Sequence, residues 1–126
     1  MKRNIPIALN IHKVSKSLSL RYSEEETYSL PAEYLRVLSP SAEVRGHGKP
    51  VLQAGKMNVN IIRIEPMGQY AIRLLFDDGH DSGIYTWNYL YDLCINQATH
   101  WDTYLKSLYH AGASRDPDAT IIKIMR

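Results

Sequence analysis

The chain has 126 residues, of which 44% are hydrophobic and 22% are charged, and its formal net charge at pH 7 is +2. This length and composition favour one globular domain with a core of its own. The sequence has neither an apolar run near the roughly 18 residues of a membrane span nor the apolar segment of a signal peptide. The single cysteine, Cys94, excludes an internal disulfide and a cysteine-based zinc site. We therefore predict a cytoplasmic protein with no membrane contact.

Basic residues gather at the start of the chain. Residues 1–22 hold no acidic residue but contain Lys2, Arg3, Lys13, Lys16 and Arg21. A basic arm of this kind can contact nucleic acid, but this one lacks interleaved aromatic residues, and the whole chain carries little net charge. We predict that residues 1–16 form a flexible, solvated arm, and we do not expect nucleic acid as a partner.

A hairpin and a short helix are predicted next. Leu18, Leu20 and Tyr22 alternate with polar residues, which is typical of a half-buried strand over residues 17–22. An acidic turn separates this strand from a second one over residues 27–30. Pro31 suits the first turn of a helix over residues 31–38, since a proline there loses no hydrogen bond.

A three-stranded antiparallel meander is the firmest structural expectation. Its strands are predicted over residues 59–65, 70–76 and 81–85, with a turn over residues 66–69. The Asp-Gly pair at Asp78 and Gly79 is a strong hairpin signal, because glycine accepts the positive φ angle of a tight turn.

Two helices are predicted after the meander. Thr86 is a natural N-cap for the first helix. Its core-facing stripe comprises Trp87, Leu90, Tyr91 and Cys94, and that of the second helix comprises Trp101, Tyr104, Leu105 and Leu108. Thr99 and Asp102 resemble a capping box for the second helix, and Gly112 can end it.

These elements predict an α+β fold, with a small antiparallel sheet, built from the hairpin and the meander, packed with two to three helices. We expect a domain over residues 17–112 between the arm at residues 1–16 and a tail at residues 113–126.

Two segments are candidates for a functional site. Residues 35–48 and 75–87 are rich in Gly, Ser and Asp, and each contains one histidine. The first opens a long polar loop over residues 39–56, and loops of that length are often functional. The candidate metal ligands are His47, His80, Glu43, Asp78 and Asp81, a set that suits zinc, iron or nickel. Alternatively, these are polar loop residues, with His80 bonded to a backbone carbonyl.

Other candidate residues give weaker signals. The candidates for contact with a partner or an anion are Arg36, Arg45, Ser39 and Ser41, although ion-paired or solvated arginines explain the pattern equally simply. His100-Trp-Asp102 matches part of a non-haem iron motif, but it opens a helix in a chain too small for the oxygenase barrel. The sequence contains no phosphate-binding glycine loop and no nucleophile elbow, so no catalytic residues are assigned.

The chain resembles a known family at three places. They are Leu30-Pro-Ala-Glu-Tyr-Leu-Arg36, Phe76-Asp-Asp-Gly-His-Asp-Ser82 and Trp87-Asn-Tyr-Leu90. The resemblance, over about residues 17–95, is to the N-terminal-like domain of gamma-butyrobetaine hydroxylase, much of which is of unknown function. Bacterial stand-alone members share the string Leu-Arg-x-x-Ser-Pro-Ser-Ala-Glu-Val-x-Gly-His-Gly.

The resemblance carries expectations about metal and partners. In dioxygenase members the domain holds a structural zinc through a Cys-Pro-Cys-x-x-Cys string and a later histidine. Here Ser39, Ser41 and Val44 stand at the cysteine positions, and the histidine remains as His80. Related domains are fused to Mrp-type ATPases of iron–sulfur assembly. We predict a non-enzymatic accessory module that binds a protein partner, with a zinc- or iron-binding domain as the alternative.

Overall fold

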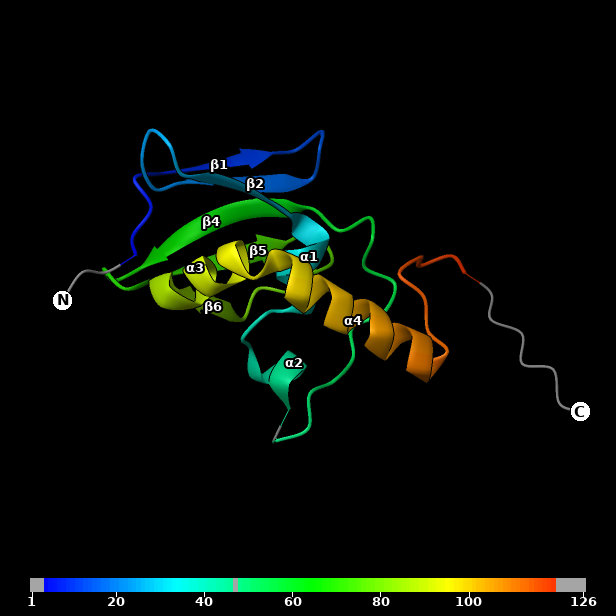
Figure 1. Cartoon of the computed structure of the whole chain (residues 1–126). Coiled ribbons are helices and arrows are strands. Elements are labelled where there is room, and N and C mark those ends of the chain that lie inside the picture. Colours follow the sequence, from blue (N-terminus) through cyan, green and yellow to red (C-terminus); the bar gives the residue numbers. More distant parts are fainter. Residues whose placement is uncertain (1–3, 47, 120–126) are drawn as a thin grey trace, which may run out of the picture.

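The computed structural model describes residues 4–46 and 48–119 (Figure 1). Along these residues the elements are β1 (Ala8–His12), β2 (Ser17–Arg21), β3 (Thr27–Pro31), α1 (Ala32–Val37), α2 (Ala42–Arg45), β4 (Ile61–Met67), β5 (Ala71–Phe76), β6 (Gly83–Thr86), α3 (Trp87–Ile95) and α4 (Gln97–Ala111). The strands form two antiparallel sheets, in the orders β1–β2–β3 and β4–β5–β6. The predicted α+β class is confirmed.

The first sheet contains one strand more than the predicted hairpin. β2 and β3 pair as expected, with Leu18 opposite Leu30, but β1 adds to the other edge of β2. The expectation that all of residues 1–16 form a flexible arm is therefore wrong for residues 8–12. Leu9 and Ile11 pack against the core from β1. The alternation of apolar and polar residues in β1 is short and flanked by basic residues, so the strand is hard to recognise in the sequence.

The second sheet confirms the predicted meander, with one shifted boundary. The turn expected over residues 66–69 begins later, because β4 continues to Met67 and Pro66 pairs with Ile72. Proline is tolerated there because β4 is an edge strand. On the side of β4 that faces away from β5 there is no neighbouring strand, so the N–H that proline lacks costs no hydrogen bond on that side. Gly68, with a φ angle of 59°, makes the turn itself.

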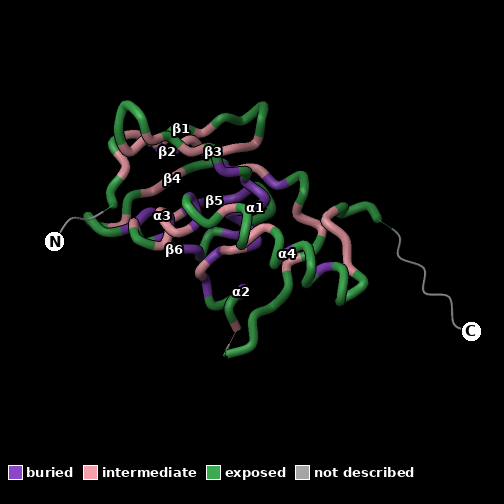
Figure 2. Tube along the Cα trace, viewed as in Figure 1, coloured by how far each residue is buried: buried purple, intermediate pink, exposed green. Residues whose placement is uncertain are grey.

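One hydrophobic core joins both sheets, α1 and α3. Its buried side chains come from every layer: Leu18 and Leu30 from the first sheet, Leu74 and Phe76 from the second, and Leu93 from α3. In Figure 2 the buried parts of the tube lie at the centre, on β5, β6, α1 and the inner face of α3, whereas most of α4 is exposed. The side chain of Thr86 caps α3 as predicted, accepting the Tyr89 N–H at 3.2 Å.

Helix α4 begins earlier than its predicted capping box. Asn96 alone separates it from α3, and Thr99 lies within its first turn rather than before it. Gly112 ends the helix in the left-handed conformation, as expected. Tyr104 and Leu108 attach α4 to Val37 in a second, smaller hydrophobic cluster.

The described part of the C-terminal segment is not a free tail. The N–H groups of Gly55 and Met57 donate to the carbonyls of Ser114 and Arg115, at 2.8 and 3.0 Å. Arg115 also makes a two-pronged ion pair with Glu33, at 2.8 and 2.7 Å. Glu33 is buried, and a buried carboxylate requires such a partner. Expecting a tail over residues 113–126 is thus wrong for residues 113–119, and residues 120–126 lie outside the described residues.

Within the described ranges, no helix has the length and hydropathy that crossing a bilayer requires, and the longest, α4, has 15 residues.

Candidate functional site

The turn between α1 and α2 forms the centre of the candidate site. Proline at position 40 prevents α1 from continuing, and the chain then enters the single turn of α2. Ser39 and Ser41 are 1% and 5% exposed, and Val44 of α2 is also buried. The Ser41 hydroxyl has no hydrogen-bond partner among the described residues. These polar side chains therefore face the protein interior.

His80 joins this turn to the tip of the β5–β6 hairpin. Its Nε2 atom lies 2.8 Å from Ser39 Oγ, and its Nδ1 atom lies 3.2 Å from Glu43 Oε2. The side chain is only 2% exposed. The sequence analysis offered a hydrogen bond from His80 to a backbone carbonyl as one alternative, but the partners in the structure are the side chains of Ser39 and Glu43. Glycine is required at position 83, because a Cβ atom there would lie 2.5 Å from Ser39 Oγ.

The His80 ring is neutral near pH 7. Burial lowers its pKa below the ordinary value of 6.5, and the Arg36 charge lowers the pKa further, against the opposing effects of Glu43 and Asp78. A neutral imidazole has one donor and one acceptor nitrogen. With Nδ1–H donating to the Glu43 carboxylate, Nε2 accepts the hydrogen of the Ser39 hydroxyl. Both nitrogens are then satisfied.

Ser39, His80 and Glu43 are connected in the same way as the serine, histidine and acid of a catalytic triad, with the histidine between the other two. A triad needs a nucleophile that substrate can reach and N–H donors aimed at the oxyanion. Ser39 is 1% exposed, and the neighbouring Ser41 N–H donates to Ser39 Oγ itself, at 3.3 Å. The contacts are therefore those of a structural link. We expect a fluorophosphonate probe to leave Ser39 unlabelled, and stoichiometric labelling would contradict this interpretation.

Replacing the ring tests the structural link. His80→Ala leaves the buried Ser39 hydroxyl without its partner, so we expect a loss of about 1–3 kcal/mol in the free energy of unfolding. The loss should be the same with and without chelator, as measured by urea denaturation. If chelator alone destabilises the wild-type protein by a similar amount, the ring holds a metal instead.

The same ring makes stability depend on pH in one direction. The unfolded histidine titrates near 6.5, and the folded one titrates lower, so the unfolded state takes up the proton first as the pH falls. The stabilising contribution of neutral His80 is thus complete above 6.5 and is lost as the pH falls through that value toward the folded pKa. His80→Gln does not titrate, and its stability should fall less between about pH 7 and 5. Parallel urea midpoints for the two proteins would refute this.

A second network fixes the far end of the long segment. The buried Arg36 donates from Nε to Asp78 Oδ2 at 2.9 Å and from a terminal nitrogen to Gln53 Oε1 at 3.1 Å. Lys56 Nζ lies 3.0 Å from the same Asp78 oxygen. Burial alone would raise the pKa of Asp78, but hydrogen bonds from Lys56, the His80 backbone and Arg36 hold this pKa below its ordinary value. The network therefore ties the segment over residues 39–56 to the β5–β6 hairpin.

Of the candidate metal ligands among the described residues, only Glu43 and His80 have side chains in contact, at 3.2 Å. Asp78 is engaged by two cations, and Asp81 is exposed and makes no ion pair with the described residues. His47 lies outside the described residues. Among residues 4–46 and 48–119, no three His, Cys, Asp or Glu side chains are grouped closely enough to hold a metal ion.

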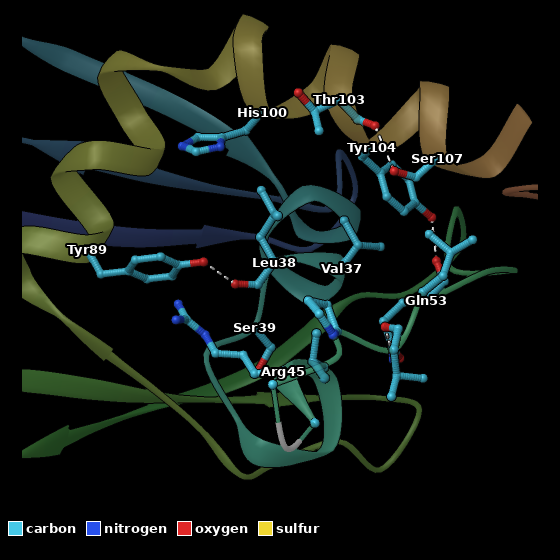
Figure 3. A pocket seen from close by; sticks show the side chains of 16 residues that line it. Val37, Leu38, Ser39, Arg45, Gln53, Tyr89, His100, Thr103, Tyr104 and Ser107 are labelled. Atoms are coloured by element: carbon cyan, nitrogen blue, oxygen red, sulfur yellow. Dashed lines mark hydrogen bonds between the residues drawn. The ribbon is translucent and has the colours of Figure 1, made fainter. Parts of the chain in front are cut away.

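A groove of about 620 Å³ lies between α4 and the facing residues 44–46 and 48–53 (Figure 3). We call it the α4 groove. It is bordered by Val37 and Leu38 at the end of α1, by Tyr104 and Ser107 of α4, and by Val51 and Leu52 of the facing segment. The Tyr104 hydroxyl donates to the Gln53 carbonyl and closes one end. The two networks above therefore support one wall of this groove.

The other end of the groove is cationic. Tyr89 of α3 donates its hydroxyl to the Leu38 carbonyl, and the guanidinium carbon of Arg45 lies 5.0 Å from the centre of the Tyr89 ring. Figure 3 shows Arg45 beside Tyr89, with His100 nearby on α4. His100 bonds Asp92 at 2.9 Å, whereas Arg45 makes no ion pair with any described carboxylate. Of the residues that line the groove, none is acidic.

Two of the residues named as candidates from the sequence lie at this groove. Arg45 and Ser39 border it, as do other residues of the long segment predicted to be functional. Tyr89 and the α4 residues were missed, because Tyr104 lies on a helical stripe that reads equally well as core. The usable signal was Tyr89, the tyrosine of the Trp-Asn-Tyr string, because its hydroxyl requires a partner when half-buried.

The fold and site define a small α+β domain in which a buried, hydrogen-bonded histidine ties a hairpin to a long segment beside a groove. The chain belongs to the family described as Gamma-butyrobetaine hydroxylase-like, N-terminal, whose sequence profile matches residues 9–91. The predicted resemblance is confirmed, and the matched range includes most of β1. Among curated proteins, no sequence matches this chain.

Solved structures of similar proteins agree with this assignment. One NMR solution structure is 57% identical, covers 99% of this chain and 100% of its own, and has a TM-score of 0.84. A second is 44% identical, covers 99% and 95%, and has a TM-score of 0.78. A crystal structure of a DUF971-family protein of unknown function from Acidithiobacillus ferrooxidans ATCC 23270 is 33% identical, covers 70% and 90%, and has a TM-score of 0.58.

The zinc site that the family resemblance implies does not fit the residues of this chain. Zinc in structural sites takes thiolate, imidazole or carboxylate ligands. Ser39 and Ser41 offer hydroxyls, Val44 offers no ligand atom, and Ser39 already shares a hydrogen bond with His80. The hydrogen bond thus joins two of the four positions that a metal would join in the dioxygenase members.

Proposed function

We propose that this chain is an accessory module without catalytic activity of its own, and that it binds a protein partner through the α4 groove. The observation that carries the proposal is the groove itself, together with its rim. Val51 and Leu52 are 52% and 37% exposed beside it, so apolar surface continues outside the cavity. Apolar surface of this kind next to a groove is characteristic of protein-docking sites.

The placement of the two networks supports the same proposal. The hydrogen bonds of His80 and Arg36 hold the segment over residues 39–56, and this segment forms one wall of the groove. A pre-shaped wall reduces the ordering cost of binding a partner. A link to iron–sulfur or other metal-cofactor metabolism rests on the fusion of related domains to Mrp-type ATPases, and it belongs to the proposal on that analogy alone.

The metal-binding alternative, through His47 and His80, has less support. Both ring nitrogens of His80 are already hydrogen-bonded, and a metal would have to displace Ser39 or Glu43. The proposed function therefore includes neither zinc nor iron.

Affinity capture with matched variants tests the proposal. Ser107→Trp places an indole in the α4 groove, whereas Lys106→Trp places one on the exposed helix surface beside it. We expect the wild-type protein and Lys106→Trp to capture the same protein from the cell extract, and Ser107→Trp to lose it. The purified partner should reproduce the difference. If no captured protein separates wild type from Ser107→Trp when both have equal thermal stability, the proposal fails.

A further inference from the structure

The cationic end of the α4 groove indicates what chemistry a partner must have. We propose that the groove binds a polypeptide segment that places an apolar side chain between Val37, Leu38 and Tyr104 and an acidic side chain against Arg45. This inference rests on the proposed function and specifies its ligand.

Charge complementarity is the first argument. Arg45 borders the groove, and its guanidinium carbon lies over the Tyr89 ring, 5.0 Å from the ring centre. No carboxylate of the described residues forms an ion pair with it, although five other arginines each have one. Arginine is the residue that best recognises a carboxylate, through two parallel hydrogen bonds. The contact with Tyr89 orients the guanidinium, so the side chain loses less conformational entropy when it binds a ligand.

The apolar part of the groove is the second argument. Between its two ends the groove presents Val37, Leu38 and Tyr104, and the Tyr104 hydroxyl is already engaged by Gln53. An apolar side chain that docks on this surface would therefore cover few polar groups that lack a hydrogen-bond partner. An anchor side chain in such a pocket typically supplies most of the binding energy of a small interface.

A polypeptide fits better than a small carboxylic acid. Small-molecule sites enclose about 70–90% of their ligand. Here the exposed apolar residues Val51 and Leu52 extend the surface past the cavity, so a ligand longer than the cavity gains additional contacts. None of the residues that line the groove belongs to a strand, which makes side-chain recognition the expected mode rather than strand addition.

A peptide array tests the inference with the full-length chain. Its members carry one Leu, Phe or Trp and, two to four residues away, one Asp or Glu in a Gly-Ser background, with matched Asn, Gln and Lys members. We expect the acidic members to bind about fivefold or more tightly than their amide partners, a difference near 1 kcal/mol. Titrating the tightest members into ¹⁵N-labelled protein should shift the amides of Arg45, Leu52 and Thr103.

Variants separate the two parts of the recognition. Arg45→Gln should abolish the preference for acid while keeping the requirement for the apolar residue, and Arg45→Lys should restore part of the preference. Arg63→Gln, on the exposed face of β4, is the matched control and should leave both unchanged. Equal binding of acidic and amide members, or an unchanged preference in Arg45→Gln, overturns the inference.

Other occupants give distinct results. If hexanoate shifts the same amides with the affinity of the tightest peptide, the groove takes a small acid and the polypeptide assignment is wrong. If the same amides shift with protein concentration alone, the occupant is a second copy of this chain. If no peptide binds while Ser107→Trp still loses a captured protein, this inference fails and the proposed function stands.

Discussion

Asp78→Asn should lower the free energy of unfolding by roughly 2–4 kcal/mol, because it leaves a buried guanidinium without a carboxylate. Arg36 is 7% exposed at its side chain and depends on Asp78 Oδ2 at 2.9 Å. The expected loss is below that of a fully buried pair, since the Asp78 side chain is 24% exposed and water moderates the charge. Urea denaturation at pH 7 measures it.

A neighbouring aspartate provides the control. Asp81→Asn changes an exposed residue of the same hairpin and should alter stability by less than about 0.5 kcal/mol. The double variant Arg36→Met/Asp78→Asn should recover part of the loss, because no unpaired buried charge remains. If Asp78→Asn and Asp81→Asn are equally mild, the network does not hold the long segment.

Acid should remove the same contribution from the wild-type protein. The pKa of Asp78 lies below its unfolded value of 3.8, so its stabilising effect is present above 3.8 and is lost as the pH falls further, toward the folded pKa. This window lies below that of His80, and the two contributions are therefore separable in a pH series. Asp78→Asn should lack the lower of the two losses.

The second large effect is a gain of metal binding. Substituting Ser39→Cys, Ser41→Cys and Val44→Cys together should create a tetrahedral zinc site with His80, because three thiolates and one imidazole form a standard structural set. All three positions are buried, and cysteine is compatible with burial. At about 100 times its dissociation constant, zinc should stabilise the variant by about 2.7 kcal/mol, or roughly 10 °C in Tm.

Cobalt(II) provides the spectroscopic check. The triple variant should give the intense visible bands of tetrahedral thiolate coordination, and zinc should displace them in a one-to-one titration. The wild-type protein and a triple variant that also carries His80→Ala are the controls. Absence of these bands in a folded triple variant would mean that the turn and His80 do not occupy the geometry of the family's metal site.

The elements with strong local signals were predictable from the sequence. The Asp-Gly turn, the Thr86 cap and the alternating residues of β2 each identify their element without reference to the rest of the fold. β1 was not predictable in this way, because its two apolar residues are recognisable as a strand only once β2 is available to pair with it. The described C-terminal residues likewise owe their place to Glu33, which is 82 positions away from Arg115.

The candidate site was predictable to the extent that its residues share a motif. The family string places Ser39 and Glu43 together, and the hairpin signal places His80 at a tip, so their meeting followed from the resemblance. Arg45 was a candidate as a cation of the long segment over residues 39–56. Its stacking on Tyr89, and the groove that Tyr104 closes, depend on how α3 and α4 pack, and no local pattern encodes that packing.

We propose that the α4 groove is the surface through which this chain binds a partner. Site-specific photo-crosslinking in living cells tests it most directly. A benzophenone amino acid at Leu52, on the rim of the groove, should give one discrete adduct that Ser107→Trp abolishes. The same amino acid at Ile84 of β6, whose exposure of 43% resembles the 37% of Leu52, should give none. Equal adducts at both positions, or none at Leu52, would contradict the account.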